Sequence, residues 1–483
     1  MFRLWLFGLI IGVPLFGLAV STGIRSHFDS ELRAAAVRQM PDADAAVAAL
    51  TVARLCETPD ADLADLCQTD TNLAIMRTAS ILSLVIGLGL ISLIALAGVA
   101  AQSNRRLLLL LFRPGLYLIA VTITGLILTH AIIAIAAIYY GESALVNRVH
   151  VGVILTIAVA AIGGVVSISV SAFGVVKKAE TIAIGTAVSR EDATGLWDQI
   201  DSVAQKLGAL RPDHIVVGLD PTFFVTEADV VTLSGRLTGR TLFCSLPLAR
   251  ILTVQEFVAI AGHELGHFRG EDTKFSERFY PTYRGTTTAI ESLHTAGGEG
   301  AGSLILLPAM FVFGFFLERF SVAESRHSRT RELLADKAGV EASSFRAMAT
   351  ALVKVHAFAG VWARFEQASI EALQDGKVYI NASKEFAEAV ANTANRAALE
   401  GVADTHTTHP TDSHPSLAVR LKSLKIDLAS VVADSLNVKP VESAATLIQD
   451  AEAREEDLSE ACQLLLARRY GIETSAQETA ASP

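Results

Sequence analysis

The chain has 483 residues, of which 51% are hydrophobic and 19% are charged, and its formal net charge at pH 7 is −10. This length is sufficient for two or three domains. The acidic balance argues against a nucleic-acid-binding protein, so we expect no nucleic acid partner. The four cysteines show neither a CxxC pair nor a Cys/His finger spacing, which excludes cysteine as a metal ligand.

Apolar residues are concentrated in four blocks in the first third of the chain. A bilayer crossing takes roughly 20 residues, and the last three blocks are long enough. The first is short enough for a secretory signal peptide, but Ala19-Val20-Ser21 matches the cleavage pattern only loosely. We therefore favour an uncleaved anchor over a cleaved signal. The predicted membrane region is 1–178, with spans at Leu4–Val20, Thr78–Ala101, Gly115–Tyr140 and Val149–Val176.

Basic residues predict the orientation of this region. They crowd the loop between the second and third blocks and follow the fourth, and short loops rich in Lys and Arg stay in the cytoplasm. These residues are Arg105, Arg106, Arg113, Lys177 and Lys178. The segment 21–77 is then external, and the chain after Lys178 begins in the cytoplasm. This pattern predicts a multi-pass protein of the cell (inner) membrane, with the lipid bilayer as a partner.

Two features of this region leave alternatives open. Cys56 and Cys67 can form a disulfide in an external segment, but two free thiols are equally compatible with the sequence. His130 lies in the middle of the third block, where a polar side chain is a functional candidate. Because no acidic residue lies within the spans, we favour a structural histidine that is hydrogen-bonded to a neighbouring helix.

After Lys178 the pattern becomes that of a domain with helices and strands. "TGLWDQIDSVAQKLGA" predicts an amphipathic helix. The short β-rich runs that follow predict a small, mostly antiparallel sheet: "HIVVGL", "TFFVTE", "VVTLSG" and "RTLFCSL". We expect this domain over 179–425 and a helical C-terminal extension over 426–483, whose end, "ETSAQETAASP", has the composition of a disordered tail.

The stretch "AGHELGHFRG" carries the strongest chemical signal. Thr253-Val-Gln-Glu256 fits a capping box, which predicts that a helix starts at Thr253. His263 and His267 then lie one turn apart on one face of this helix, so both imidazoles can reach one ion. Glu264 follows the first histidine directly and can project toward the same space.

This arrangement suits zinc. Zinc accepts imidazole nitrogen and carboxylate oxygen in a tetrahedral site, and a catalytic site keeps one position for water. The metal lowers the pKa of that water to ~7, and Glu264 can take its proton. H-E-x-x-H is the zincin motif, so we expect Zn²⁺ as the cofactor.

A third protein ligand is expected in "SRTRELLADKAG", where Glu332 and Asp336 share one face of a helix. We predict that Glu332 ligates the zinc. Asp336 is predicted to hydrogen-bond the far nitrogen of a zinc histidine, which fixes the tautomer of that ring. Glu324 and His327 are alternative ligands whose spacing fits less well.

HELGH followed by S-R-x-x-E-x-x-A-D, behind several apolar spans, resembles the membrane zinc metalloproteases that include the bacterial heat-shock protease HtpX and the eukaryotic CAAX prenyl proteases. The resemblance covers about 210–424. It implies an α-helical membrane region joined to an α+β zincin (gluzincin-like) catalytic domain over 179–425. The family also carries an H-P-x-x-x-x-R element, which "HPSLAVR" matches. This match implies that His414 helps to hold the transition state and that Arg420 pairs with carboxylates near the zinc.

The chain also departs from these relatives. HtpX relatives usually have two spans before the motif and an apolar pair after it, whereas this chain has four before it. The prenyl proteases have more spans, which enclose a chamber, so the sequence does not support cleavage of prenylated peptides.

The apolar block Gly302–Phe316 stands between HELGH and Glu332. If it crossed the membrane once, the two halves of the zinc site would lie on opposite sides of ~30 Å of hydrocarbon. It is also too short for two spans. We therefore expect it to be re-entrant, to lie in the interface or to pack inside the catalytic domain, and we favour a membrane-associated helix that holds the site near the bilayer.

The sequence thus predicts a membrane-anchored zinc endopeptidase that cleaves polypeptides, in particular membrane proteins, with Glu264 as the general base. The resemblance implies a role in membrane protein quality control. The alternative is a catalytically silent membrane scaffold or regulator with a zinc site, against which Glu264 argues, because a structural site needs no base. A transporter built on the four spans rests on His130 alone. Cleavage preference, oligomeric state and activation trigger are not determined by the sequence.

Overall fold

The computed structural model describes residues 2–39, 47–58, 60–173, 180–269, 279, 283, 286–287, 290–291, 301–395, 399 and 415–472. The chain divides into two compact units. The first, which we call the helical unit, comprises Met1–Lys177 and Thr282–Ala323. The second, the mixed unit, comprises Lys178–Pro281 and Glu324–Pro483.

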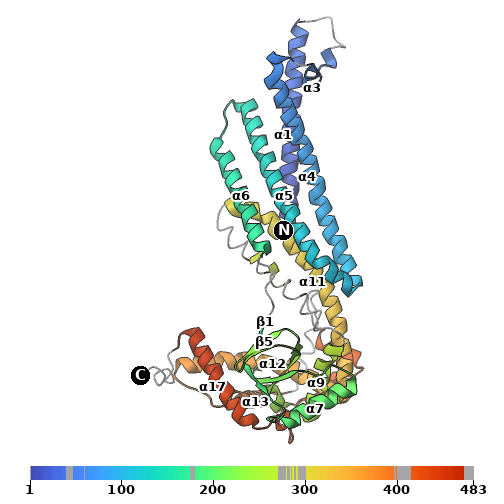
Figure 1. Cartoon of the computed structure of the whole chain (residues 1–483), viewed down its shortest axis with the longest axis vertical. Helices are drawn as coiled ribbons and strands as arrows, with labels where there is room; N and C mark the ends of the chain where they lie inside the picture. The colour runs from blue at the N-terminus through green and yellow to red at the C-terminus, as the bar shows by residue number, and fades with distance from the viewer. Residues whose placement is uncertain are drawn as a thin grey trace. The chain divides into compact units, whose positions relative to one another are not determined.

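The helical unit is built on long helices, of which α1, α4 and α5 run side by side (Figure 1). Its elements are α1 (Phe2–Gln39), α3 (Val52–Leu55), the 3₁₀ turn η1 (Ala61–Leu63), α4 (Ala64–Ser103), α5 (Arg105–Val146), α6 (Val151–Phe173) and the first part of α11 (Ala301–Ala342). The external segment predicted over 21–77 is therefore largely helical in its described part, because α1 continues past the first apolar block and α4 begins before the second.

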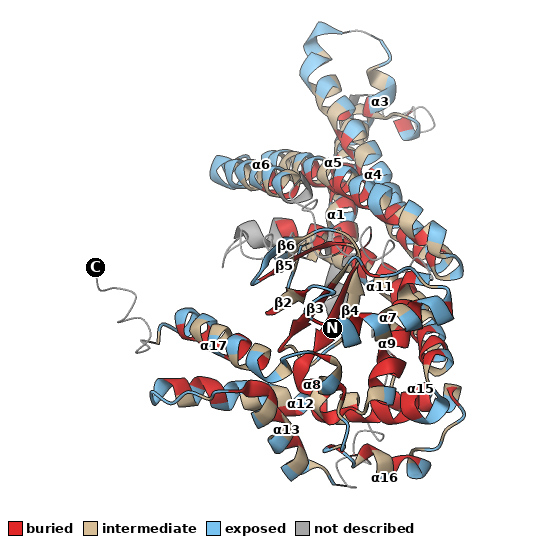
Figure 2. Cartoon of the chain, turned by 60° about the horizontal axis from the view of Figure 1, so that its bottom comes forward, coloured by how far each residue is buried: buried red, intermediate tan, exposed pale blue. Residues whose placement is uncertain are grey.

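Four helices in the described part of the chain are long and apolar enough to cross a membrane. Their candidate spans are Ala61–Ser103, Arg105–Ala144, Val151–Val170 and Leu306–Ala342. The first two contain the second and third predicted blocks, and the third, Val151–Val170, lies within the fourth predicted block, Val149–Val176. The predicted Leu4–Val20 span lies in α1, which is not one of the four. The fourth candidate is in α11. Figure 2 shows α6 largely exposed, and many large apolar side chains of α4, α5 and α6 are exposed as well, as a lipid-facing surface requires.

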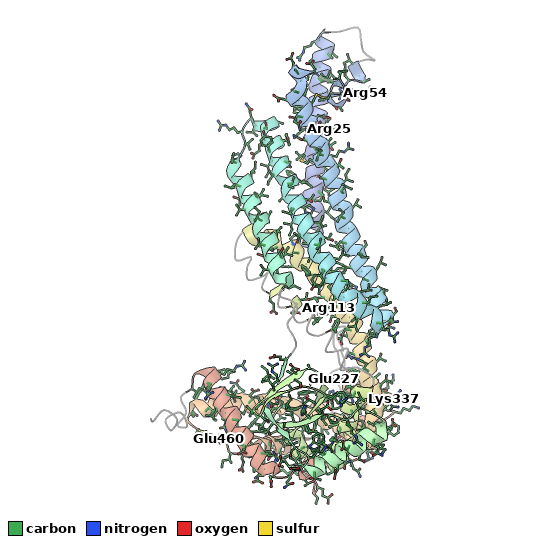
Figure 3. All side chains as sticks on the ribbon, viewed as in Figure 1. Arg25, Arg54, Arg113, Glu227, Lys337 and Glu460 are labelled. Atoms are coloured by element: carbon green, nitrogen blue, oxygen red, sulfur yellow. A yellow bond between two sulfur atoms is a disulfide. The ribbon has the colours of Figure 1, made fainter. Side chains whose placement is uncertain are left out.

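One end of the helical unit is held by polar contacts and a disulfide. Arg25 of α1 donates to both carboxylate oxygens of Asp70 of α4, at 2.7 and 3.0 Å. Cys56 and Cys67 are bonded to each other, so of the two alternatives the disulfide is confirmed. Arg25 and Arg54 lie toward this end of the unit in Figure 3, whereas Arg113 lies toward the opposite end.

The mixed unit contains two small sheets, and antiparallel pairs outnumber parallel ones among the described strands. The four-stranded sheet has the order β2-β3-β7-β4, and the three-stranded sheet has the order β1-β5-β6. The pairs β3–β7 and β1–β5 are parallel. The strands are β1 (Glu180–Ile182), β2 (Gly185–Val188), β3 (His214–Gly218), β4 (Phe224–Thr226), β5 (Asp229–Thr232), β6 (Gly235–Leu237) and β7 (Thr241–Ser245).

The sheets are mixed because β4, β5 and β6 are inserted between β3 and β7, so that the chain returns to β3 in the same direction. All five residues of β7 are buried, as are the last four residues of β3. The amphipathic helix predicted after Lys178 is α7 (Thr194–Leu207), and its apolar face is part of the main core. β1 and β2 precede the runs from which the sheet was predicted, so the sequence analysis did not include them.

The remaining helices complete the mixed unit. They are α8 (Leu246–Ile251), α9 (Val254–Arg269), α12 (Phe345–Gln374), α13 (Ala382–Thr393), α15 (Leu417–Ser423), α16 (Val432–Ser435) and α17 (Ala451–Tyr470), with 3₁₀ turns η2 (Leu428–Ser430) and η3 (Ala444–Leu447). The predicted tail lies outside the described residues from 473 onward.

The apolar block Gly302–Phe316 belongs to one continuous helix, α11, that also carries Glu332. Its residues up to Ala323 group with the helical unit, which differs from the single domain predicted over 179–425. The physical reason is aromatic and close backbone packing. The ring of Phe316 stacks on Phe112 of α5 at 5.4 Å, and a Cβ added at Gly115 would lie 3.0 Å from the Phe316 ring.

The C-terminal extension packs against the beginning of α9. Ser443 forms an antiparallel bridge with Thr253, and the Ala444 N–H donates to the Leu252 carbonyl at 2.8 Å. Arg250 of α8 donates to the fully buried carboxylate of Glu455 in α17, at 2.8 Å from Nε. The extension is therefore part of the core that positions the HELGH helix.

Candidate metal centre

The HELGH residues lie on α9, which begins as the sequence predicts. The Thr253 N–H donates to Glu256 Oε2 at 2.7 Å, and the Glu256 N–H donates to Thr253 Oγ1 at 3.2 Å. This is the reciprocal capping box. Glu256 is buried and also accepts a hydrogen bond from Lys354 Nζ of α12 at 2.8 Å. The start of the helix is thus fixed by its own cap and by a neighbouring helix.

Two glycines let α9 approach the second part of α11 closely. A Cβ added at Gly262 would lie 2.3 Å from the Cβ of Ala342. One added at Gly266 would lie 2.9 Å from the Cβ of Ala338. Real Cβ atoms do not approach this closely, so only glycine allows this backbone separation. Each glycine directly precedes a histidine of the motif. The close approach therefore brings both histidines next to the helix that carries Glu332.

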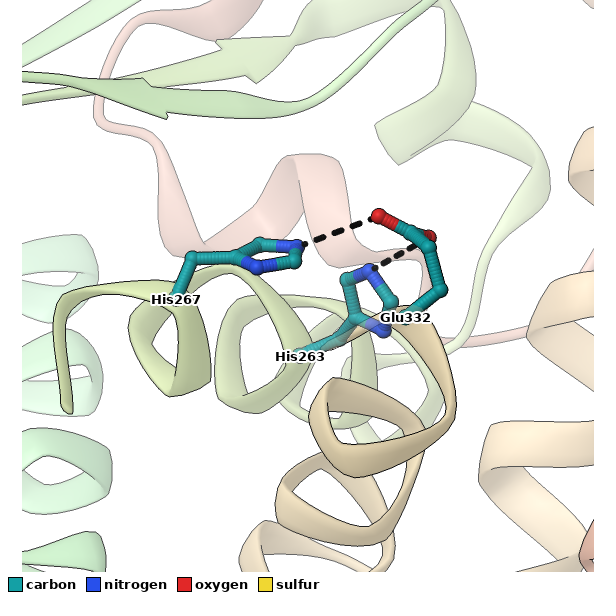
Figure 4. Close-up of side chains that lie close together, drawn as sticks. All are labelled: His263, His267 and Glu332. Carbon is teal, nitrogen blue, oxygen red and sulfur yellow. Dashed lines mark ion pairs between the residues drawn. The ribbon is translucent and has the colours of Figure 1, made fainter. Parts of the chain in front are cut away.

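His263, His267 and Glu332 form one cluster, in which a ligand atom from each lies within 4.8 Å of the others. His263 Nε2 is 3.6 Å from Glu332 Oε2, and His267 Nε2 is 3.5 Å from Glu332 Oε1 (Figure 4). A nitrogen ligand at 2.0–2.1 Å and a carboxylate oxygen at 2.0–2.2 Å from one zinc at the tetrahedral angle would be about 3.4 Å apart. The donor set and its spacing therefore fit a zinc ion.

Asp336 and Arg420 form hydrogen bonds that fix the orientation of His263. His263 Nδ1 lies 3.0 Å from Asp336 Oδ1, so this nitrogen donates to the carboxylate and Nε2 is the nitrogen that faces Glu332. Arg420 Nε donates to Asp336 Oδ2 at 2.9 Å, and its terminal nitrogens contact Asp336 Oδ1 and approach Glu332 Oε2. Burial alone would raise the pKa of Asp336, but the hydrogen bonds from His263 and Arg420 outweigh it and hold that pKa below its usual range.

Glu264 lies beside the cluster in a different electrostatic environment. Burial raises the pKa of its carboxyl, and the negative charge of Glu332 acts in the same direction. Electrostatic interactions with His263, His267 and Arg420 act in the opposite direction without cancelling this rise. A carboxyl with a raised pKa accepts and returns protons closer to neutral pH than an ordinary glutamate does.

The structure places most of the predicted site residues together. His263, His267, Glu264, Glu332, Asp336 and Arg420 all lie at this cluster. Of the alternative ligands, Glu324 is ion-paired with Arg331 at 3.5 Å, and neither it nor His327 belongs to the metal-compatible group found among the described residues. His414 lies outside the described residues.

Sequence reasoning missed Gly262 and Gly266 as well as Lys354. The glycines have a local signal, since two small residues at i and i+4 on a helix permit close packing. Lys354 has none, because its partners are the Glu256 carboxylate and two backbone carbonyls, of Ile251 and Asn437, that are distant in the sequence.

Comparison with known proteins supports this site. The family described as Peptidase family M48 matches residues 232–426, which include the whole cluster. The chain is 27% identical over 237 residues to the Protease HtpX homolog of Archaeoglobus fulgidus, covering 47% of this chain and 65% of that protein. It is 30% identical over 168 residues to the Protease HtpX homolog of Pyrobaculum aerophilum, covering 33% and 46% of the two chains.

A third relative, the Protease HtpX homolog of Thermoplasma acidophilum, is 28% identical over 155 residues, covering 30% of this chain and 47% of that protein. The chain thus spans about half to two thirds of the length of these relatives. No solved structure matches the chain significantly. The region 232–426 of this chain, which carries the clustered HELGH and Glu332 residues, is thus similar to peptidase family M48 and to the HtpX homologs.

Proposed function

We propose that this chain is a membrane-anchored, zinc-dependent endopeptidase. The observation that carries the proposal is the cluster of His263, His267 and Glu332, with Glu264 beside it. The two histidines and Glu332 would hold the ion. When bound there, zinc would act as a Lewis acid that polarises the scissile carbonyl. It would also lower the pKa of water, so that the water becomes a good nucleophile near neutral pH.

Glu264, Asp336 and Arg420 would have separate roles in the reaction. Glu264 takes a proton from the attacking water and returns it to the leaving amine, for which its raised pKa is suited. Asp336 keeps the proton of His263 on Nδ1, so that Nε2 stays available as a ligand. Arg420 neutralises Asp336 within the core and adds positive charge near Glu332.

The sheet offers a place for an extended polypeptide. β4 forms the outer edge of the four-stranded sheet and contacts α9, the helix that carries the motif. An unpaired strand edge can accept a substrate as a further strand, held by main-chain hydrogen bonds. Such binding depends on the main chain of the substrate more than on its side chains, so it can accept many sequences. We propose that the physiological role is the turnover of misassembled membrane proteins, which such broad binding would suit.

We further propose that the catalytic residues face the cytoplasm of an inner-membrane protein. The Cys56–Cys67 disulfide supports an external position for its end of the helical unit, because disulfides persist outside the cytoplasm. Arg113 lies toward the other end, in agreement with the positive-inside rule.

The test uses purified full-length protein and a Glu264→Gln variant. Wild type should contain about one zinc per chain and cleave an unfolded test substrate such as casein. Glu264→Gln should keep the zinc and the fold but lose turnover by about 10²- to 10⁴-fold, because it removes the base and leaves the ligands.

Three results would count against parts of the proposal. Proteolysis that persists in Glu264→Gln would show that the assigned mechanism is wrong. A wild type that binds zinc but cleaves neither casein nor a membrane protein substrate would instead favour the silent scaffold. Full zinc occupancy in Glu332→Ala would show that the third ligand is another residue.

A further inference from the structure

The helical unit contains a cavity that the proposed proteolysis does not use. Its volume is about 230 Å³, and it is lined by residues of α1, α4, α5, α6 and α11. Residues from each helix include Val13, Gly87, Ala134, Ile157 and Val312. Every lining side chain is apolar or absent except that of His130. An engineered apolar cavity of about 150 Å³ already binds benzene, so this cavity has room for a somewhat larger molecule.

His130 lacks the partner that a structural histidine would have. Nε2 is buried and has no hydrogen-bond partner among the described residues, so the predicted bond to a neighbouring helix is not found. Leaving a buried polar group unsatisfied is unfavourable. Because His130 lines the cavity, a change in the orientation of its ring can present a nitrogen to a molecule there.

Water does not satisfy this site well. A buried water typically needs two to four polar partners, and the side chains that line this cavity offer only one. A molecule with an apolar body and a single hydroxyl or carbonyl group would fill the apolar walls and satisfy His130 at once. We propose that the cavity is a binding site for such a small amphiphile, held by apolar contacts and one hydrogen bond to the His130 imidazole.

The test compares 1-octanol with n-nonane, which has the same number of non-hydrogen atoms but a methyl group in place of the hydroxyl. Full-length protein in lipid nanodiscs is titrated with each by calorimetry, and the signal of empty nanodiscs is subtracted. One hydrogen bond predicts that wild type binds octanol roughly fivefold tighter than nonane, relative to partition into the bilayer. In His130→Leu the ratio between the two ligands should fall by that factor while nonane still binds. Comparing ratios cancels the difference in partition.

Two further variants of α5 complete the design. Ala134→Leu adds atoms inside the cavity and should weaken both ligands, whereas Ile132→Leu, at a position that is 66% exposed and does not line the cavity, should behave as wild type. His130→Leu removes an unsatisfied polar group, so it should fold at least as well as wild type, and circular dichroism checks this. An octanol-to-nonane ratio unchanged in His130→Leu would overturn the role of the imidazole. Absence of binding above empty nanodiscs, or unchanged binding in Ala134→Leu, would overturn the site.

Discussion

At the residue scale, Asp336 and Arg420 form the hydrogen-bonded pair next to His263, the histidine that we propose as a zinc ligand. Asp336 is fully buried and Arg420 is 5% exposed, so each charge depends on the other in the core. Asp336 also accepts the hydrogen bond from His263. The same carboxylate therefore contributes to stability through Arg420 and to metal affinity through His263.

Asp336→Asn separates these two contributions. The substitution should lower zinc affinity by about 10- to 100-fold, because the histidine loses a charged hydrogen-bond partner. It should also lower the free energy of unfolding of the zinc-free protein by about 3–5 kcal/mol, because buried Arg420 loses its hydrogen-bonded carboxylate and keeps only the longer contact with Glu332. Chelator competition measures the affinity, and denaturant unfolding of the zinc-free protein measures the stability.

The double variant Asp336→Asn, Arg420→Met is the control for this prediction. Removing the arginine charge should restore much of the lost stability while zinc binding stays weak. Recovery of zinc affinity together with stability would mean that Asp336 acts on the metal only through folding, and the assignment of its bond to His263 as the positioning contact would fail.

At the element scale, the separation between α9 and α11 decides whether the ligands meet. Gly262 and Gly266 lie on the face of α9 that contacts Ala338 and Ala342, and they leave no room for a side chain. A helix gains about 1 kcal/mol when an interior glycine is replaced by alanine, provided that nothing is in the way. Packing and propensity therefore make opposite demands at these positions, and packing prevails.

Gly262→Ala tests this balance. Its Cβ would lie 2.3 Å from Ala342, so the helices must move apart, and we expect a lower Tm together with weaker zinc binding. Gly360→Ala, in α12, is the matched control, since its Cβ would have nothing within 4 Å. That variant should gain up to about 1 kcal/mol and bind zinc normally. If Gly262→Ala is as stable as Gly360→Ala and keeps its zinc, the close approach is not what positions the ligands.

At the scale of the whole molecule, α11 links the two units within one covalent helix. Its apolar part groups with the helical unit and its Glu332 part with the mixed unit. A single helix can do both because its 42 residues extend over about 63 Å. The domain predicted over 179–425 contained both the apolar block and Glu332, whereas the two compact units divide α11 between them.

The proposed orientation in the membrane is testable with the native cysteines. In a variant with Cys244→Ser and Cys462→Ser, only the bonded pair Cys56 and Cys67 remains. An impermeant thiol reagent should label this variant in intact cells or spheroplasts only after reduction. If labelling requires permeabilised membranes, the segment 21–77 is cytoplasmic, and the proposed topology is reversed.

The sequence by itself determined the local features of this protein. The capping box, the i and i+4 histidines and the i and i+4 pair of Glu332 and Asp336 each follow from the periodicity of a helix, and the apolar blocks follow from the thickness of a bilayer. The Cys56–Cys67 bond was one of two alternatives that the sequence left open, because composition does not fix how two thiols are brought together.

Only the tertiary structure decided how these local features meet. The parallel pairing of β3 and β7 depends on the insertion of three strands between them, which no local pattern encodes. Phe316 packs the first part of α11 against Phe112 of α5. The contact of His263 with Asp336 and Arg420 joins three helices that are far apart in the sequence. The missing partner of His130 likewise became visible only once its neighbours were in place. Side-chain periodicity assigns a residue to a face of its own helix, but which element that face meets is determined by packing of the whole chain.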